Sequence, residues 1–142
     1  MLDLSIRPAV SALEREQAFD IRRTVLCGEL HMGREAARDA FDDQALLLVG
    51  WLGEKPVATG RMVERAPGWV VEHLAVLGPW RRQGVGRALL AAFRAEGEAK
   101  GLPRLLAVGP SGALPFLQAG GFRLENEDEG VVLTAYYRVL RA

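Results

Sequence analysis

The spacing of apolar and polar positions divides the first third of the chain into a strand and helices. Residues 2–8, LDLSIRP, alternate in character and end at a proline, which predicts a strand. Ser11 and Glu14 have the spacing of a capping box at the start of a helix. Apolar residues then recur at helical spacing as far as Gly28, at Leu13, Ala18, Ile21, Val25 and Leu26. We expect a second, shorter helix over residues 34–40.

Three apolar runs separated by turn residues predict the middle of a sheet. Residues 45–52 form a nearly continuous apolar strand, and the turn GEKP leads into a second strand over residues 57–65. A Pro-Gly turn follows. Residues 69–77, WVVEHLAVL, are mostly apolar, so we expect a central strand that is covered on both faces.

The last third combines helices with short strands. The expected elements are a helix over 87–101, a strand over 104–108, a helix over 111–120, and hairpin strands over 121–125 and 131–140. Ser111 is the predicted cap of the second helix, and residues 126–130 the acidic hairpin turn. The resulting order is strand, two helices, three strands, helix, strand, helix and two strands. It predicts an α/β fold with a mixed sheet, without the strict alternation of a doubly wound fold.

Composition and charge narrow the class of protein. The 142 residues suit one domain, 1–142, and their 49% hydrophobic and 25% charged content is that of a soluble globular protein. Eighteen basic and eighteen acidic residues cancel, so the overall charge favours neither nucleic acid nor an anionic membrane. The N-terminus does not resemble a signal peptide, and no apolar stretch reaches the roughly 20 residues that span a bilayer. We therefore expect a cytoplasmic protein.

The lone cysteine, Cys27, excludes an intramolecular disulfide and a multi-cysteine zinc site. Because no other ligand cluster stands out, we expect no metal. An acyl-cysteine intermediate is one interpretation of Cys27, and a small buried hydrophobe is the commoner one.

Residues 81–86, RRQGVG, connect a predicted buried strand to a predicted helix. Gly84 and Gly86 let the backbone turn tightly and let a ligand approach without a Cβ in the way. The first N–H groups of the helix lack helical partners and lie at the positive end of its dipole, so the segment suits a phosphate group. The alternative is a plain turn with solvated arginines. The spacing fits neither a P-loop nor a Rossmann fingerprint.

With its neighbours, this loop resembles a known signature. Residues 74–90, LAVLGPWRRQGVGRALL, resemble the [Q/R]-x-x-G-x-[G/A] segment of GCN5-related N-acetyltransferases (GNAT). Residues 21–30, 41–62 and 113–122 are similar to other segments of that family, in the expected order. They resemble most its small bacterial branch of glucosamine-phosphate acetyltransferase-like and ElaA-like members. The resemblance implies a mixed, mostly antiparallel sheet of six to seven strands that splays between strands four and five.

The resemblance also implies acetyl-CoA as co-substrate. In the family, the pantetheine pairs with the exposed edge of strand four, here Leu74, Ala75 and Val76, and an N–H near Val76 polarises the thioester carbonyl. The pyrophosphate contacts carried over by position are Arg81, Arg82, Gln83, Gly84, Val85, Gly86 and Arg87. The strand residues are equally expected as core residues, because backbone contacts leave their side chains free to pack.

Glu72 is the candidate catalytic residue. A protonated amine has no lone pair, so a carboxylate or a water chain must accept its proton, and the branch resemblance implies a glutamate at this position. Strand alternation predicts Glu72, Leu74 and Val76 on one face, and His73 on the other. The alternative for Glu72 is a strand-end charge or a salt bridge with an arginine.

The chain departs from the family pattern at Leu117, where a tyrosine usually protonates the leaving thiolate. Tyr136, Tyr137 or water could replace that acid, or thiolate departure needs none. In the family, the first interhelical segment commonly forms one wall of the acceptor cleft, so the resemblance implies that His31, Met32 and Arg34 are better placed than the core to touch an acceptor.

These observations lead to three hypotheses for function. The first is an acetyl-CoA-dependent N-acetyltransferase that acts on an unidentified primary amine by direct transfer in a ternary complex. The second, suggested by Leu117, is a non-catalytic acyl-CoA-binding or sensing module. The third is an interaction domain that dimerises through its last hairpin, and a homodimer is compatible with all three.

Overall fold

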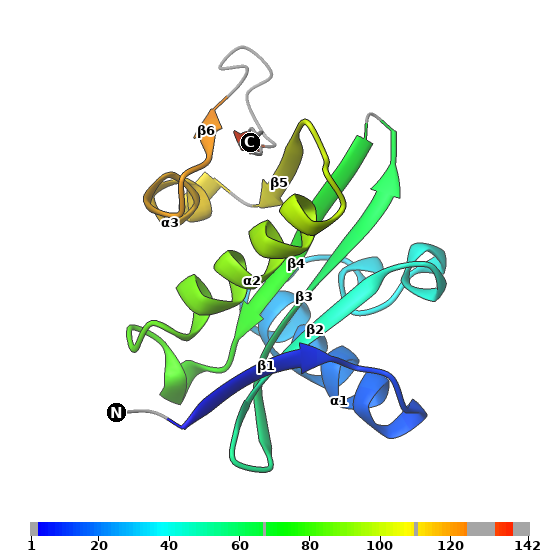
Figure 1. The fold of residues 1–142 in the computed structure, drawn as a ribbon. Coiled ribbons are helices and arrows are strands. Elements are labelled where there is room, and N and C mark those ends of the chain that lie inside the picture. The colour runs from blue at the N-terminus through cyan, green and yellow to red at the C-terminus, as the bar shows by residue number, and fades with distance from the viewer. Residues whose placement is uncertain (1–2, 67, 110, 125–132, 138–142) are drawn as a thin grey trace.

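The computed structural model describes residues 3–66, 68–109, 111–124 and 133–137. Within them, seven strands form one sheet in the order β1-β2-β3-β4-β5-β7-β6 (Figure 1). The strands are β1 Leu4–Pro8, β2 Leu46–Leu52, β3 Lys55–Arg65, β4 Gly68–Val76, β5 Leu105–Gly109, β6 Arg123–Leu124 and β7 Leu133–Tyr137. Neighbouring strands are antiparallel except β4 and β5, which are parallel. The predicted α/β class with a mixed sheet is confirmed.

Helices and tighter helical turns flank this sheet. They are α1 Ala12–Arg22, the π-helix η1 Arg23–Glu29, the 3₁₀ turns η2 Arg34–Ala36, η3 Ala40–Asp43 and η4 Gly78–Trp80, α2 Val85–Ala99, the 3₁₀ turn η5 Ser111–Ala113, and α3 Leu114–Ala119. Within the described residues, none of these helices has the length and apolar character needed to cross a bilayer.

The first helix begins as predicted and ends differently. Ser11 Oγ accepts from the Glu14 N–H at 3.1 Å, and Glu14 accepts from the Ser11 N–H at 3.0 Å, which confirms the capping box. The helical segment expected as far as Gly28 is present, but it is not one α-helix throughout. Beyond Arg22 the chain widens into η1, in which the hydrogen bonds span five residues.

Two further predictions about helices are wrong. The helix expected over residues 34–40 is replaced by η2 and η3, because the Asp39 side chain accepts from the Phe41 N–H and starts a new turn there. Helix α3 has Ala113 as its N-cap in place of Ser111, since the chain first makes the 3₁₀ turn η5.

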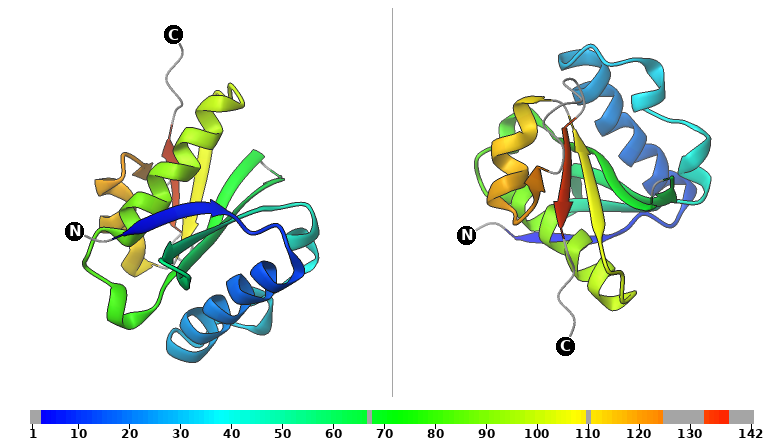
Figure 2. Two further views of the ribbon diagram at one scale, coloured as in Figure 1. Left: turned by 60° about the horizontal axis from the view of Figure 1, so that its bottom comes forward. Right: turned by 90° about the horizontal axis from the view of Figure 1, so that it is seen from above.

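Helices α1 and α2 cover opposite faces of the sheet (Figure 2). On one face, Leu89 and Phe93 of α2 pack in a core with Met62 and Val71; we call this the α2 side. On the other face, which we call the α1 side, Phe19 of α1 packs in a cluster with strand β2. Of the apolar positions predicted for the first helical segment, Ala18, Ile21, Val25 and Leu26 are buried.

Leu13 is an exception to this pattern. It was predicted to belong to the apolar stripe of the first helix, but it is 69% exposed. Leu13 lies in the first turn of α1, so the packed part of the helix begins later, at residues such as Ala18.

Strands β4 and β5 diverge after a short common stretch (Figure 1). Their register joins only Val70 to Leu106 and Val71 to Ala107. Strand β4 continues to Val76, so its last residues have no partner on β5. The splay expected between the fourth and fifth strands is present. The C-terminal hairpin is confirmed by the antiparallel pairing of β6 with β7, while residues 126–130 lie outside the described part of the chain.

Candidate active site

The N-terminus of α2 presents backbone donors to open space. Gly84 caps the helix with a φ of 83°, and the Ala88 N–H donates to the Gly84 carbonyl at 3.0 Å. The N–H groups of Val85, Gly86 and Arg87 precede that bond, so helix geometry provides them with no carbonyl. A Cβ added at Gly84 would meet nothing within 4 Å. This end of the helix can therefore receive an anion.

Two side chains of the loop, those of Arg81 and Gln83, contact neighbouring segments of the chain. Arg81 turns back toward β4, where its Nε donates to the Val76 carbonyl at 2.8 Å. The Nη2 of Arg81 also pairs with Glu29 Oε1, at the end of η1, across 2.7 Å. Gln83 Nε2 donates to the Pro79 carbonyl at 3.0 Å. The loop, the end of β4 and the end of η1 are thus tied together.

Two exposed arginines remain beside the helix N-terminus. Arg82 and Arg87 are exposed, and within the described residues neither has an ion-pair partner. Arg82 has a φ of 61°, an uncommon conformation for a residue with a side chain. Their charges are available to an anion held by the backbone.

Gly86 brings the start of α2 close to the end of β4. A Cβ at Gly86 would lie 3.3 Å from the ring of Phe116 and 3.5 Å from Val76 Cγ2. The open N-terminus of α2 and the unpaired edge of β4 therefore lie side by side. The sequence predicted both features, and the fold brings them together.

A β-bulge interrupts β4 next to this edge. Arg61 of β3 pairs with Glu72, but Thr59 pairs with Ala75, so two steps along β3 oppose three along β4. His73, inside the bulge, has a φ of 56°. An extra residue reverses the faces on which the following side chains lie.

The bulge makes the predicted face assignment wrong. Simple alternation placed Glu72 with Leu74 and Val76, and His73 opposite. Leu74 and Val76 pack against the α2-side core, whereas Ala75 packs among buried residues of α1 and η1 on the α1 side. Glu72 lies on the α1 side too, because its carboxylate contacts Arg61 of β3, whose guanidinium also pairs with Asp39 and Asp42 in the η3 region. His73 is close enough to the same charges to respond to them.

The end of β4 keeps a backbone donor at the splayed edge. The Leu77 N–H donates to the Val57 carbonyl of β3 at 2.9 Å. Adjacent residues of an antiparallel strand direct their backbone groups to opposite sides. The N–H and carbonyl of Val76 therefore face away from β3, toward the side where β5 diverges, and the carbonyl accepts from Arg81.

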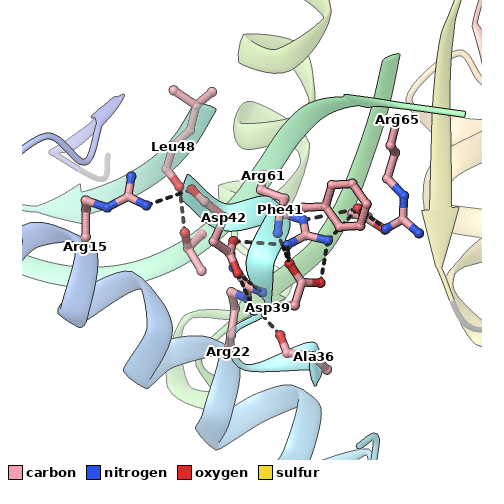
Figure 3. Close-up of polar contacts among 11 residues, drawn as sticks. Arg15, Arg22, Ala36, Asp39, Phe41, Asp42, Leu48, Arg61 and Arg65 are labelled. Atoms are coloured by element: carbon pink, nitrogen blue, oxygen red, sulfur yellow. Dashed lines mark hydrogen bonds and ion pairs between the residues drawn. The ribbon is translucent and has the colours of Figure 1, made fainter. Parts of the chain in front are cut away.

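Six charged side chains form a cluster between the sheet and η3 (Figure 3). Its members, which we call the charge cluster, are Arg22, Asp39, Asp42, Arg61, Arg65 and Glu72. Fully buried Arg61 donates from Nη1 and Nη2 to the two oxygens of Asp39 at 2.5 and 2.9 Å. Its Nε and Nη2 donate to Glu72 Oε2 at 3.1 and 2.8 Å. Arg22, also buried, makes a bidentate pair with Asp42 at 2.6 and 3.2 Å.

The arginines favour the ionised forms of Asp39 and Asp42. Burial acts to raise the pKa of Asp42, but hydrogen bonds and charge from Arg22, with the charge of Arg61, lower that pKa below its ordinary value. Burial likewise opposes the lowered pKa of Asp39, which the hydrogen bonds and charge of Arg61 produce. The carboxylates in turn raise the pKa of Arg61 despite its burial.

Glu72 is held mainly through one carboxylate oxygen. Its Oε2 accepts from Arg61 and also from Arg65 Nη1 at 3.1 Å. Within the described residues, the contact to Oε1 is a longer one, 3.4 Å from the same Arg65 nitrogen. The residue is 7% exposed. The structure thus contains the salt bridge that the sequence left open as the alternative for Glu72, with one oxygen less occupied than the other.

His73 is uncharged at neutral pH. Burial, followed by the charges of Arg22 and Arg61, lowers the pKa of His73 to about 4. A base with so low a pKa is poorly matched to proton transfer near pH 7. The structure therefore gives no reason to prefer His73 over Glu72 as proton acceptor.

Sequence reasoning did not find Arg61, Asp39 or Asp42. The available signals were an arginine inside an apolar strand and the acidic segment around residues 39–43. Charged residues are almost never fully buried unless they are paired, so an arginine at a central strand position indicates a buried partner. Its carboxylates lie far away in the sequence, and no local pattern identifies them.

The remaining candidate residues are Leu117, Tyr136, Tyr137, Cys27 and Met32. Leu117 is buried in the α2-side core, as expected for an apolar residue at the tyrosine position. The side chains of Tyr136 and Tyr137 lie outside the described part of the structure. Cys27 is partly buried and its Sγ contacts the Gly33 carbonyl at 3.4 Å, while Met32, just beyond η1, is exposed.

Comparison with known proteins identifies the relatives of this chain. The model of the acetyltransferase (GNAT) family matches residues 12–122. An uncharacterised N-acetyltransferase of Bacillus subtilis, YjcF, is 29% identical over 124 residues, which are 85% of this chain and 89% of that protein. The structure of Escherichia coli ElaA has a TM-score of 0.78 at 17% identity, covering 97% of this chain and 100% of ElaA. The PaiA N-acetyltransferase of Thermoplasma acidophilum, solved in complex with coenzyme A, has a TM-score of 0.73 at 14% identity, covering 96% and 99% of the two chains.

Proposed function

Because the chain belongs to the GNAT family of acetyltransferases, we propose that it transfers an acetyl group from acetyl-CoA to a primary amine by direct transfer in a ternary complex. The observation that carries this proposal is the adjacency of two features. The open N-terminus of α2 lies against the unpaired end of β4, where the Val76 N–H faces the splay. One site suits a pyrophosphate and the other an extended chain of amides.

The proposed contacts to acetyl-CoA follow from this arrangement. The edge of β4 at Leu74, Ala75 and Val76 pairs with the pantetheine, and the Val76 N–H polarises the thioester carbonyl. The residues proposed at the pyrophosphate are Arg81, Arg82, Gln83, Gly84, Val85, Gly86 and Arg87. Arg82 and Arg87 contribute exposed guanidinium groups, and the start of α2 contributes N–H groups. Arg81 and Gln83 order the loop through their contacts to Val76 and Pro79.

Glu72 is the proposed proton acceptor, directly or through a water. The amine nitrogen bonds to the thioester carbon, its proton passes toward Glu72 Oε1, and the carbon–sulfur bond then breaks. The leaving thiolate takes a proton from water or from Tyr136 or Tyr137, since Leu117 has none to give. No step requires a metal ion.

The finer classification is also part of the proposal. The resemblance of residues 21–30 to the glucosamine-phosphate acetyltransferase-like and ElaA-like branch supports placement there, whereas 17% identity to ElaA supports the fold alone. The balanced charge leaves open a small amine, an amino sugar, an antibiotic, a polyamine or a protein amine as acceptor. A cytoplasmic location is part of the proposal. A homodimer is compatible with this assignment.

Calorimetry and a thiol-release assay test the function. We expect acetyl-CoA to bind, and CoA to be released with at least one of four amines: spermidine, tyramine, glucosamine 6-phosphate and a lysine-containing peptide. Glu72→Gln should lower kcat by roughly 100-fold or more, the usual contribution of a general base, with little change in acetyl-CoA affinity. Binding without turnover by the wild type would favour the acyl-CoA-binding module that Leu117 suggests, and absence of binding would favour an interaction domain.

A further inference from the structure

Arg61 contacts Glu72, the proposed proton acceptor, and also two carboxylates of the η3 region on the α1 side. It is fully buried in β3, and its guanidinium contacts carboxylates of β4 and of the η3 region (Figure 3). Resting on the function proposed above, we propose that Arg61 is a positioning residue for the acetyl transfer. It fixes Oε2 of Glu72 and thereby leaves Oε1 as the atom that accepts the proton of the amine.

The unequal occupation of the two Glu72 oxygens carries this inference. Three donor contacts of 3.1 Å or less converge on Oε2, two from Arg61 and one from Arg65. The contact to Oε1 measures 3.4 Å, which is beyond the usual length of an N–H···O bond. A carboxylate held in this way keeps its orientation while one oxygen retains lone pairs for a new partner.

The rest of the charge cluster fixes the guanidinium itself. Arg61 donates hydrogen bonds from both Nη atoms to Asp39, and its Nη1 lies 3.1 Å from Asp42 Oδ1. Asp42 is in turn paired with Arg22 of α1. Three arginines face three carboxylates, so the cluster is balanced, with His73 uncharged beside it. The planar fork of an arginine can satisfy two carboxylates at fixed angles, whereas a lysine presents a single nitrogen.

Stability alone does not account for so many buried charges. Replacing a buried ion pair by well-packed apolar residues is often neutral or stabilising. The charge cluster borders the β4 bulge, where β4 has left β5, which is the place where the acceptor must meet the thioester in the proposed reaction. A role in orienting Glu72 gives the cluster a function that an apolar core could not supply.

A double-mutant cycle tests the inference. We compare wild type, Arg61→Lys, Glu72→Gln and the double variant in thiol release with the most active of the four amines named above. Arg61→Lys should lower kcat at least about 10-fold, with the Kd for acetyl-CoA and the KM for the amine within about 2-fold. In the Glu72→Gln background the same substitution should have little further effect on kcat, because the group that Arg61 orients is gone.

The control is Arg15→Lys, at an arginine of α1 that lies outside the charge cluster and donates to the Asp42 carbonyl at 2.7 Å. It should leave kcat within about 2-fold, and urea unfolding measures how far each substitution destabilises the fold. The inference is overturned if Arg61→Lys retains wild-type kcat, if Arg15→Lys lowers kcat as much, or if the losses from Arg61→Lys and Glu72→Gln simply multiply. Wild-type protein that releases no CoA with any of the amines overturns the proposed function, and this assignment with it.

Discussion

Gly60 of β3 lies directly against Leu74 of β4. A Cβ added at Gly60 would come within 2.6 Å of Leu74 Cδ2 and 2.9 Å of Phe93 Cε2. Leu74 belongs to the bulged stretch of β4, and Phe93 lies on α2. The absence of a side chain at one position of β3 therefore lets both the bulge and the helix pack closely against the sheet.

We predict that Gly60→Ala destabilises the protein by about 1–3 kcal/mol, because the added carbon overpacks the core. It should also weaken acetyl-CoA binding, since Leu74 must shift along the edge proposed to hold the pantetheine. Urea unfolding and calorimetry measure the two effects. Gly50→Ala is the control, because a Cβ there would make ordinary contacts of 3.5 Å or more. Equal effects of the two substitutions would contradict this account.

The fold was largely predictable because its signals are local. Alternating or continuous apolar runs identified each strand, and Ser11 with Glu14 identified the start of α1. The bulge in β4 had no such signal. It depends on the fit between Leu74 and Gly60 across two strands and appears locally only as the positive φ of His73. Strand alternation therefore placed Glu72 on the wrong face relative to Leu74.

The same distinction between local and long-range signals applies to the candidate site. The glycine loop is a contiguous motif, so its residues could be read from the sequence together with the edge of β4. The charge cluster is assembled from α1, η3, β3 and β4, and its ion pairs span up to 22 positions along the chain. Arg61 inside an apolar strand indicated that a partner exists. The tertiary fold determines which carboxylates pair with Arg61.

A negative charge introduced at Gly84 should weaken acetyl-CoA binding. We predict that Gly84→Asp weakens binding at least about 10-fold relative to Gly84→Asn, because the added carboxylate faces the same N–H groups as the pyrophosphate. Asparagine has nearly the same shape and tolerates the φ of 83°. Calorimetry at two salt concentrations measures the difference, which should shrink at high salt. Equal affinities would exclude the start of α2 as the anion site.

The pair of Glu29 and Arg81 should compete with the bound anion. The two side chains are each 41% exposed and lie 2.7 Å apart, so their contribution to stability is small. We predict that Glu29→Gln raises acetyl-CoA affinity about 2–5-fold, because Arg81 is no longer shared with a carboxylate. Glu35→Gln, at another exposed glutamate of the same segment, is the control and should leave affinity unchanged. A loss of affinity in Glu29→Gln would show that Arg81 must be held by Glu29 in order to serve the site.

His73 should make stability depend on pH. Its pKa is lowered from 6.5 to about 4, so between these values the unfolded chain binds a proton that the folded chain does not. The free energy of unfolding should therefore fall as the pH falls from about 6.5 to about 4, by up to about 3 kcal/mol. The lowered pKa values of Asp39 and Asp42 act in the same direction below their ordinary value of 3.8.

Two matched variants assign that pH dependence to one histidine. His73 and His31 both have a φ of 56°, which asparagine tolerates, but His31 is exposed. We predict that His73→Asn flattens the fall in unfolding free energy between pH 6.5 and 4, because asparagine does not titrate, while His31→Asn retains the wild-type slope. Urea unfolding at half-unit pH intervals measures the slopes, so a constant stability loss from the substitution does not interfere. An unchanged slope in His73→Asn would mean that the imidazole reaches solvent and gains its proton in the folded state at its ordinary pKa.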